Sequence, residues 1–254
     1  MIINADDFGL TDGVTAGIVE SILNGAVSAT SAMVCLPEAV ENLGRWAPKL
    51  GGQVGLHLQL TDGIPCAQPS LIPSLLTADG RFPRSWRHLG MLNPDEVRRE
   101  WRAQMERILS LGIRPTHIDT HHHVHRLPVA FDVYCEIAKT YGIPARTLTP
   151  QMTAKLRSQG VLCAEYCERG WYGGELTSGD FVRCVQKGFA LCGGDGTIEL
   201  MCHPGFSDAE LESKSTYTAE REKELQTLCS PELAGRLRDL GIEVVSGVGL
   251  ASES

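Results

Sequence analysis

The sequence predicts an α/β fold in which a parallel sheet forms a single (β/α) barrel, either closed or distorted and incomplete. Short apolar runs alternate with helical segments along the whole chain, and this alternation is typical of parallel sheets. The 254 residues, of which 43% are hydrophobic and 21% are charged, can bury one large core. Because we find no linker, internal repeat or low-complexity tract, we expect one domain over residues 1–254.

The N-terminal half predicts three strands, each followed by a helix. The strands are expected at 1–5, 27–34 and 54–60. Thr11 or Asp12 caps a helix that ends at Asn24-Gly25, and Pro37 opens a second helix that reaches about Leu50. A long irregular segment at about 61–92, rich in proline and glycine, precedes an amphipathic helix that begins at Pro94.

The C-terminal half continues the alternation. A histidine-rich strand is followed by a helix up to Tyr141-Gly142 and by a short strand at 145–148. The segment 150–179 has little periodicity and is predicted to be a second long loop. The last expected elements are a helix at 181–189, a strand at 197–201, a charged helix at about 218–240 and a strand at 242–245.

The histidine-rich stretch His-Ile-Asp-Thr-His-His-His-Val-His holds five of the eight histidines of the chain, at 117–125. If it is a strand, its side chains alternate between two faces, and one face carries His117, Asp119, His121, His123 and His125. A row of imidazoles beside a carboxylate can hold a divalent metal, and Asp119 is either a ligand or the group that fixes an imidazole's tautomer. The alternative is a set of hydrogen-bonded core histidines.

Other polar residues also lie at or near the C-terminal ends of predicted strands, where the active sites of such barrels lie. They are Asp6-Asp7, His57 and His203. Gly9 permits a sharp turn after the two aspartates, which can bring both carboxylates to the mouth of the barrel. A metal there would leave one aspartate as a ligand and the other as a base. One aspartate and two histidines would form an open metal site, and His203 is a candidate general acid.

Arg146, at the end of a predicted strand, could orient Asp6, bind a substrate oxygen or form an ordinary salt bridge. A metal-bound water, an aspartate base and a histidine acid together indicate hydrolysis through a tetrahedral oxyanion. These residues do not indicate whether the bond that is hydrolysed is an amide, an ester or a phosphate ester.

The net charge, the apolar runs and the cysteines of the chain limit the kinds of partner and compartment that we expect. The net charge of −8 argues against a nucleic-acid backbone, which would require a basic surface. No apolar run approaches the roughly 20 residues that cross a bilayer, and the N-terminus does not look like a signal peptide. The nine scattered cysteines contain no C-x-x-C pair and are typical of reduced thiols in a cytoplasmic protein.

At its polar motifs the chain resembles the YdjC/ChbG family of carbohydrate deacetylases, which includes the hopanoid-associated HpnK-like proteins. The matching segments are Asn-Ala-Asp-Asp-Phe-Gly-Leu at 4–10, Gly-Leu-His-Leu at 55–58, Thr-His-Ile-Asp-Thr-His-His-His-Val-His at 116–125 and Met-Cys-His-Pro-Gly at 201–205. They span nearly the whole chain. The resemblance implies a barrel related to polysaccharide deacetylases and the removal of an N-acetyl group from an amino sugar, in an oligosaccharide or glycoconjugate.

Carried over one residue at a time, the resemblance implies that Asp7, His57 and His121 bind the metal. It assigns Asp6 as the base on the metal-bound water and His203 as the acid for the departing amine. It leaves zinc and magnesium open, although two imidazoles and one carboxylate favour zinc on ligand softness. The chain could also form a homodimer, which neither the sequence nor the resemblance decides.

Residues around this centre are expected to bind substrate or to support the ligands: Asp119, His123, His125 and Arg146. Trp86, Trp171 and Tyr172 lie in the two long loops and offer flat faces either for sugar rings or for packing onto the barrel. Two other readings stay open, namely another metal-dependent hydrolase (a phosphoesterase or an amidohydrolase) and a non-catalytic sugar-binding barrel.

Overall fold

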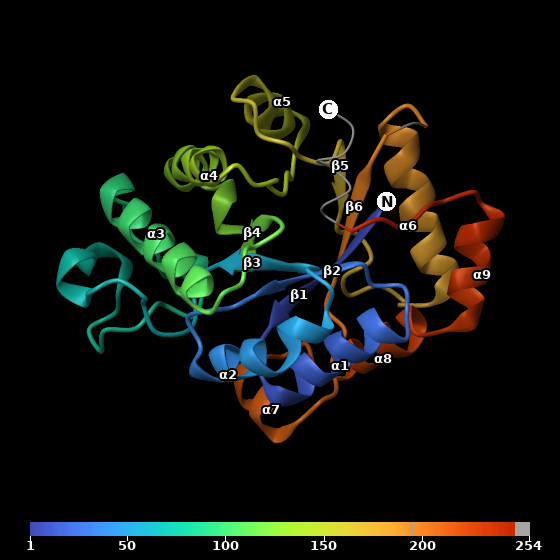
Figure 1. Ribbon diagram of the computed structural model, residues 1–254, viewed down its shortest axis with the longest axis horizontal. Coiled ribbons are helices and arrows are strands. Elements are labelled where there is room, and N and C mark those ends of the chain that lie inside the picture. Colours follow the sequence, from blue (N-terminus) through green and yellow to red (C-terminus); the bar gives the residue numbers. More distant parts are fainter. Residues whose placement is uncertain (195, 247–254) are drawn as a thin grey trace.

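The computed structural model describes residues 1–194 and 196–246, and its centre is one parallel sheet (Figure 1). Its six strands have the order β4-β3-β2-β1-β6-β5. They are β1 (Ile2–Phe8), β2 (Ala29–Ala32), β3 (Val54–Leu58), β4 (Ile118–Thr120), β5 (Tyr166–Glu168) and β6 (Ile198–Cys202). The sheet is curled into a half-barrel with β4 and β5 at its edges, so the predicted α/β barrel is confirmed in its incomplete form.

Helices surround the curled sheet (Figure 1). Helix α1 packs on β1, α3 on β3, and α6 on β5 and β6. Thr11 and Asn93 cap α1 and α3 through their side-chain oxygens, and Gly142 ends α4 in the left-handed conformation. The helices are α1 (Asp12–Leu23), α2 (Pro37–Trp46), α3 (Pro94–Ser110), α4 (Pro128–Tyr141), α5 (Pro150–Ser158), α6 (Ser178–Leu191), α7 (Ala209–Lys214), α8 (Ala219–Leu228) and α9 (Pro231–Asp239).

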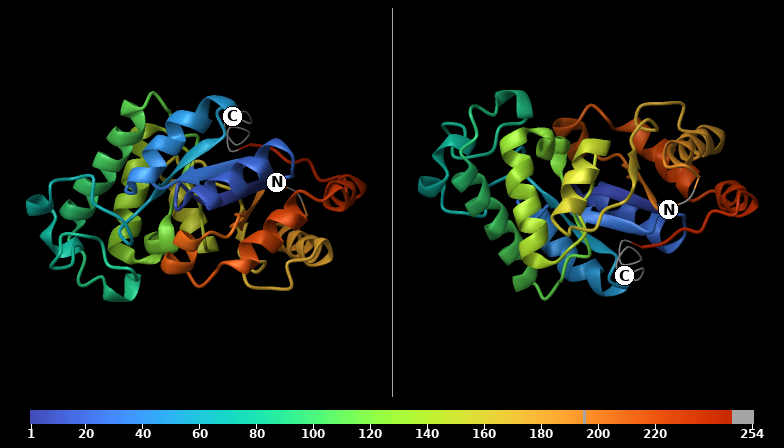
Figure 2. Two further views of the ribbon diagram at one scale, coloured as in Figure 1. Left: turned by 90° about the horizontal axis from the view of Figure 1, so that it is seen from below. Right: turned by 90° about the horizontal axis from the view of Figure 1, so that it is seen from above.

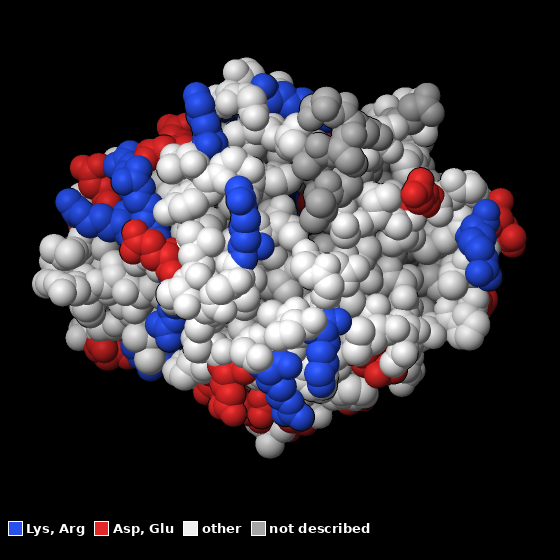
Figure 3. All heavy atoms as spheres, in the orientation of Figure 1, with Lys and Arg blue, Asp and Glu red and all other residues white. Residues whose placement is uncertain are grey.

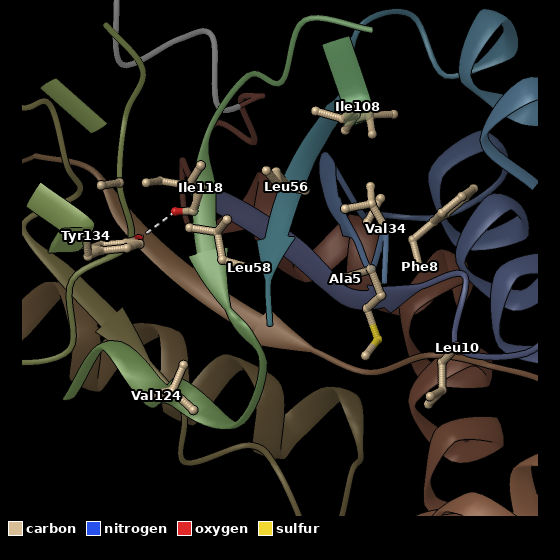
Figure 4. Packing of buried hydrophobic residues seen from close by; sticks show 14 of the residues in the cluster. Ala5, Phe8, Leu10, Val34, Leu56, Leu58, Ile108, Ile118, Val124 and Tyr134 are labelled. Carbon is tan, nitrogen blue, oxygen red and sulfur yellow. Dashed lines mark hydrogen bonds between the residues drawn. The ribbon is translucent and has the colours of Figure 1, made fainter. Parts of the chain in front are cut away.

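The apolar core lies between the sheet and these helices (Figure 4). Leu56, Leu58 and Ile118 from neighbouring strands are fully buried in it. Tyr134 of α4 is buried as well and donates its hydroxyl to the carbonyl of Ile118 over 2.7 Å, which ties α4 to the edge strand. This packing keeps β4 in register beside β3, where His57 pairs with Asp119.

The prediction of one continuous histidine strand is wrong beyond Thr120. Residues His121–Arg126 form a 3₁₀ turn in which His122 and His123 have φ angles of 53° and 51°. This left-handed backbone is costly for residues with a Cβ and ends the alternation of faces. His121, His123 and His125 therefore do not share one strand face with Asp119.

Several boundaries in the C-terminal half also differ from the prediction. The expected strand at 145–148 is a single bridge between Ala145 and Ile118. The expected loop 150–179 contains α5 and β5, and the charged helix at 218–240 is two helices, because Ser230 and Pro231 start α9. The last strand, expected at 242–245, is replaced by coil whose Val245 amide donates to Met1.

The loop 61–92 contains three short 3₁₀ turns and lies beside α3 at one end of the molecule, with α9 at the other end (Figure 2). On the face shown in Figure 3, basic and acidic side chains are interspersed. Among residues 1–194 and 196–246, we find no helix with the length and apolar character that crossing a bilayer requires.

Candidate active site

The carboxyl ends of four strands converge on one cavity of about 390 Å³. Asp6 and Asp7 come from β1, His57 comes from β3, His121 follows β4, and His203 follows β6. All five line the cavity. Because parallel strands end at the same edge of a sheet, residues more than 100 positions apart in the sequence meet there.

The two adjacent aspartates both reach the cavity because β1 is irregular at this point. The pairing with β2 passes from Ala5–Thr30 to Phe8–Ala32, so β1 carries one extra residue, and Asp7 has a φ angle of 69°. The strand is thus distorted at Asp7 itself. The turn that the sequence suggested follows it, since the amide of Leu10 donates to the carbonyl of Asp7 over 3.0 Å and Gly9 has a φ angle of 90°. Glycine is also required here for space, because a Cβ at Gly9 would lie 2.3 Å from the Cβ of Ala39.

Asp7, His57 and His121 form a compact cluster in which one possible ligand atom of each lies within 4.8 Å of the others. The Oδ1 atom of Asp7 is 3.4 Å from Nε2 of His57 and 3.1 Å from Nδ1 of His121. All three residues are buried, at 3%, 2% and 7% exposure. The three predicted metal ligands are therefore brought together.

Asp119 lies behind His57. Its Oδ1 atom is 2.7 Å from Nδ1 of His57, so a proton on Nδ1 leaves Nε2 facing Asp7. Burial alone lowers the pKa of an imidazole, but Asp119, Asp7 and Asp6 raise the pKa of His57 to about 10. The surrounding carboxylates thus strongly favour a positive charge at this position.

Asp62, which sequence reasoning missed, contacts the third member of the cluster. It lies in a turn just after β3, with a φ angle of 55°, and its Oδ2 atom is 3.2 Å from Nε2 of His121. Burial opposes protonation of His121, yet Asp62 and Asp7 raise its pKa. The Thr61-Asp62-Gly63 turn at a strand end was the available sequence signal.

Asp6 is held by Arg146 in a bidentate ion pair, with both distances 2.6 Å. The same guanidinium also lies 2.8 Å from Asp119 and 2.7 Å from Glu199 of β6. Burial would raise the pKa of Asp6, but Arg146 holds it far below its usual range. Arg146 therefore pairs with Asp6, which is one of the roles that the sequence suggested for it. Its ion pair with Glu199 was not suggested by the sequence.

His203 lies 4.0 Å from Asp6, measured from Nε2 to Oδ2. Its backbone amide donates to the buried carboxylate of Glu224 over 2.5 Å, which links the turn after β6 to α8. Burial lowers the pKa of His203 to about 4, so the imidazole is neutral at neutral pH. Its Nδ1 atom is buried and has no hydrogen-bond partner among the described residues.

Arg221 of α8 is the second functional candidate that sequence reasoning missed. Its Nη2 atom donates to Oδ2 of Asp7 over 2.7 Å, and only 3% of the residue is exposed. Although burial opposes ionisation, Arg221 and the two imidazoles hold the pKa of Asp7 well below its usual range. No local signal identified this arginine, because the segment reads as an ordinary charged helix.

The remaining predicted residues divide between the cavity and the core. His123 lines the cavity, whereas His125 is fully buried, stacks on Tyr134 at 4.7 Å and contacts Thr120. Tyr172 lines the cavity and stacks on Tyr217 at 4.2 Å. Trp171 does not reach the cavity, because it is buried against Phe181. The structure therefore removes Trp171 as a substrate contact.

Trp86, from the long loop 61–92, also lines the cavity. The guanidinium of Arg126 lies over its ring at 4.7 Å. Tyr172 and Trp86 thus offer aromatic surface beside the cluster, and such rings pack well against the apolar faces of sugars.

The donor set of the cluster suits a divalent cation. Two imidazoles and a carboxylate can bind zinc or a similar ion and leave coordination positions for water and substrate. The buried Asp119 behind His57 and the net negative charge of the groups around the imidazoles agree with such an ion.

Comparison with known proteins gives a consistent result. The family model described as "YdjC-like protein" matches residues 1–239. A carbohydrate deacetylase of Geobacillus stearothermophilus is 37% identical over 249 residues, which cover 96% of this chain and 95% of the relative. A chitooligosaccharide deacetylase of Yersinia enterocolitica is 35% identical over 257 residues and covers 97% of both chains.

Solved structures agree on the fold. The crystal structure of a putative cellobiose-phosphate cleavage protein from Enterococcus faecalis has a TM-score of 0.90 at 29% identity, covering 98% of this chain and 97% of that one. A family 4 carbohydrate esterase from Streptomyces lividans has a TM-score of 0.53 at 12% identity, covering 96% and 90%, and shares the fold.

Proposed function

The chain belongs to the YdjC-like protein family, and from this premise we propose that it is a metal-dependent carbohydrate deacetylase that removes an N-acetyl group from an amino sugar. The observation that carries the proposal is the meeting of Asp7, His57 and His121 with Asp6 and His203 in one cavity. A ligand cluster, a carboxylate and an imidazole are the groups that hydrolysis of an amide requires. The names of the relatives point to the same activity.

Asp7, His57 and His121 would hold one divalent cation. Bound there, the ion would supply Lewis-acid chemistry, lowering the pKa of a coordinated water and polarising the acetyl carbonyl. Asp119 accepts the proton on Nδ1 of His57, so Nε2 is the nitrogen that would bind the metal in exchange for a proton. Zinc or another late transition metal suits these donors better than magnesium does.

Asp6 and His203 would move the protons. Asp6, which Arg146 holds in its ionised form, would accept a proton from the attacking water. His203 lies 4.0 Å from Asp6 and would be the next proton acceptor. The imidazolium formed in this way donates the proton to the nitrogen of the departing amine.

The cavity walls would hold the sugar. A volume of about 390 Å³ lies within the range of small-molecule sites. Tyr172 is half-exposed and is backed by Tyr217, so its ring is presented rigidly beside His203. Tyr172 and Trp86 are the proposed stacking surfaces, and His123 is a proposed polar contact.

The direct test is acetate release from N-acetylglucosamine oligomers and other acetylated amino sugars. We expect release by the purified protein, loss of release after chelation, and recovery when zinc, cobalt or magnesium is added back. Elemental analysis should find one ion per chain. Absence of acetate release from every sugar of a broad panel, with the metal content confirmed, would refute the proposed activity.

A further inference from the structure

Arg221 has one guanidinium nitrogen that the protein does not use. Its Nε atom donates to the carbonyl of Tyr217 over 3.2 Å, and its Nη2 atom donates to Asp7 over 2.7 Å. Its Nη1 atom is buried and has no hydrogen-bond partner among residues 1–194 and 196–246. The side chain lines the cavity beside Asp7 and His203.

This arrangement is held firmly. Arg221 lies in the first turn of α8, and its carbonyl accepts from the amide of Gly205, two residues after His203. Its guanidinium lies over the ring of Tyr217 at 5.9 Å. The orientation of the free nitrogen is therefore set by α8, by the turn after β6 and by the aromatic wall together.

A buried, charged donor without a partner costs free energy and calls for an oxygen ligand of high negative charge. Asp7 divides its carboxylate between two tasks, since Oδ2 accepts from Arg221 while Oδ1 faces the imidazoles. Arg221 therefore borders the place where a metal-ligating oxygen and a substrate oxygen would meet. In deacetylation, the oxygen that gains negative charge is the acyl oxygen, which becomes part of the carboxylate of acetate.

We propose that Nη1 of Arg221 binds the acyl oxygen of the substrate and, after the reaction, the carboxylate of the released acetate. This inference rests on the proposed function. It gives Arg221 direct contact with the reacting group, in addition to holding Asp7 so that one carboxylate oxygen faces the cation. A charged donor aimed at the developing negative charge favours the transition state over the bound substrate.

The experiment is a calorimetric titration of the zinc-loaded protein with sodium acetate, made for the wild type, Arg221→Lys and Arg221→Gln. Each protein is measured at a zinc concentration that saturates it. We expect acetate to bind Arg221→Gln about 10- to 100-fold more weakly than wild type, because a charge-assisted hydrogen bond is lost. The acetate affinity of Arg221→Lys should lie between those of the wild type and Arg221→Gln, since lysine keeps the positive charge but lacks the several N–H donors of the planar guanidinium.

Kinetics give a second readout. Removing a contact that strengthens as charge develops should lower kcat more than it raises KM. Added guanidinium chloride should partly restore the turnover of Arg221→Ala. Arg236→Gln, which changes an exposed arginine of α9, is the matched control and should keep wild-type acetate affinity.

An Arg221→Gln protein that binds acetate as tightly as wild type at saturating zinc would overturn the proposal, because Arg221 would then act through Asp7 alone. If Arg221→Gln does not fold, the acetate affinity of Arg221→Lys at saturating zinc is compared with that of the wild type, and equal affinities would overturn the proposal. Failure of the proposed function is a separate result: wild type would release no acetate from any sugar, whatever its affinity for acetate.

Discussion

Replacing Asp119 by asparagine tests the role of the carboxylate behind His57. Oδ1 of Asp119 is 2.7 Å from Nδ1 of His57, while Oδ2 is 2.8 Å from both the hydroxyl of Ser31 and Nη2 of Arg146. Both sides of the carboxylate therefore face groups that donate. An amide has one oxygen and one NH₂ group and cannot accept on both sides.

The two amide orientations fail in different ways. With the NH₂ group toward Arg146, two donors oppose each other in a buried site, which costs about 1–3 kcal/mol of stability. With the NH₂ group toward His57, the imidazole must accept at Nδ1 and carry its proton on Nε2, where it cannot bind a metal. Losses at such supporting groups are typically 10- to 100-fold, so we expect zinc affinity to fall by roughly 10- to 100-fold.

The assay is a competitive zinc titration of Asp119→Asn, paired with urea unfolding of the zinc-free protein. Asp132→Asn is the matched control, because Asp132 is an exposed carboxylate paired with Lys155. Ser31→Ala removes the hydrogen bond to Asp119, together with the contacts of the same hydroxyl with His57 and Asn4, but keeps the charge of Asp119. It should weaken zinc binding by only a few-fold. Wild-type zinc affinity in Asp119→Asn would refute the reasoning that Asp119 sets the tautomer of His57.

Three further predictions concern other parts of the site. Asp6→Asn should lower kcat by about 10²- to 10⁴-fold, as for loss of a general base, while zinc content measured by elemental analysis stays near wild type. Tyr172→Ala should raise KM by about tenfold with little change in kcat, measured by acetate release, because its contact with the sugar is equal in the ground and transition states. Burial raises the pKa of Glu224 from 4.5 to about 7, so the native state binds the extra proton and wild-type stability should fall as pH rises through this range. In Glu224→Gln this contribution, about 3 kcal/mol, should disappear from urea unfolding curves.

Each of these predictions has a contrary outcome. Loss of zinc together with activity in Asp6→Asn would make Asp6 a ligand and not the base. A fall in kcat at constant KM in Tyr172→Ala would place Tyr172 in the reaction instead of in sugar binding. If the free energy of unfolding changes equally with pH in the wild type and in Glu224→Gln, Glu224 does not titrate as described. The control is Glu212→Gln, at an exposed position of α7, which should keep the pH dependence of the wild type.

Some features of the fold could be read directly from local sequence. Thr11 caps α1, Pro94 starts α3, and Gly142 ends α4 in the left-handed conformation, as capping chemistry predicts. These features depend on interactions within four or five residues. The break between α8 and α9 had a local signal as well, in Ser230 and Pro231, but the charged pattern on both sides concealed it.

The histidine stretch shows the limit of such local reasoning. Its composition identified the site, but the assumption of regular strand geometry misplaced His123 and His125. Two consecutive residues in the left-handed region are unfavourable locally and persist only where tertiary contacts hold them. Here the hydroxyl of Thr61 lies 3.0 Å from Nδ1 of His122, and His125 stacks on Tyr134 of α4. Neither contact can be seen in the order of the residues.

The sequence by itself determined which chemical groups end the strands: Asp6, Asp7, His57 and His203, with His121 just after β4. Because parallel strands point the same way, residues at their carboxyl ends lie along the same edge of the sheet. Only the tertiary structure decided which groups surround them. Asp62, Glu199 and Arg221 come from a loop, a strand and a distant helix, and their contacts depend on the packing of separate elements and on one irregular residue pair in β1.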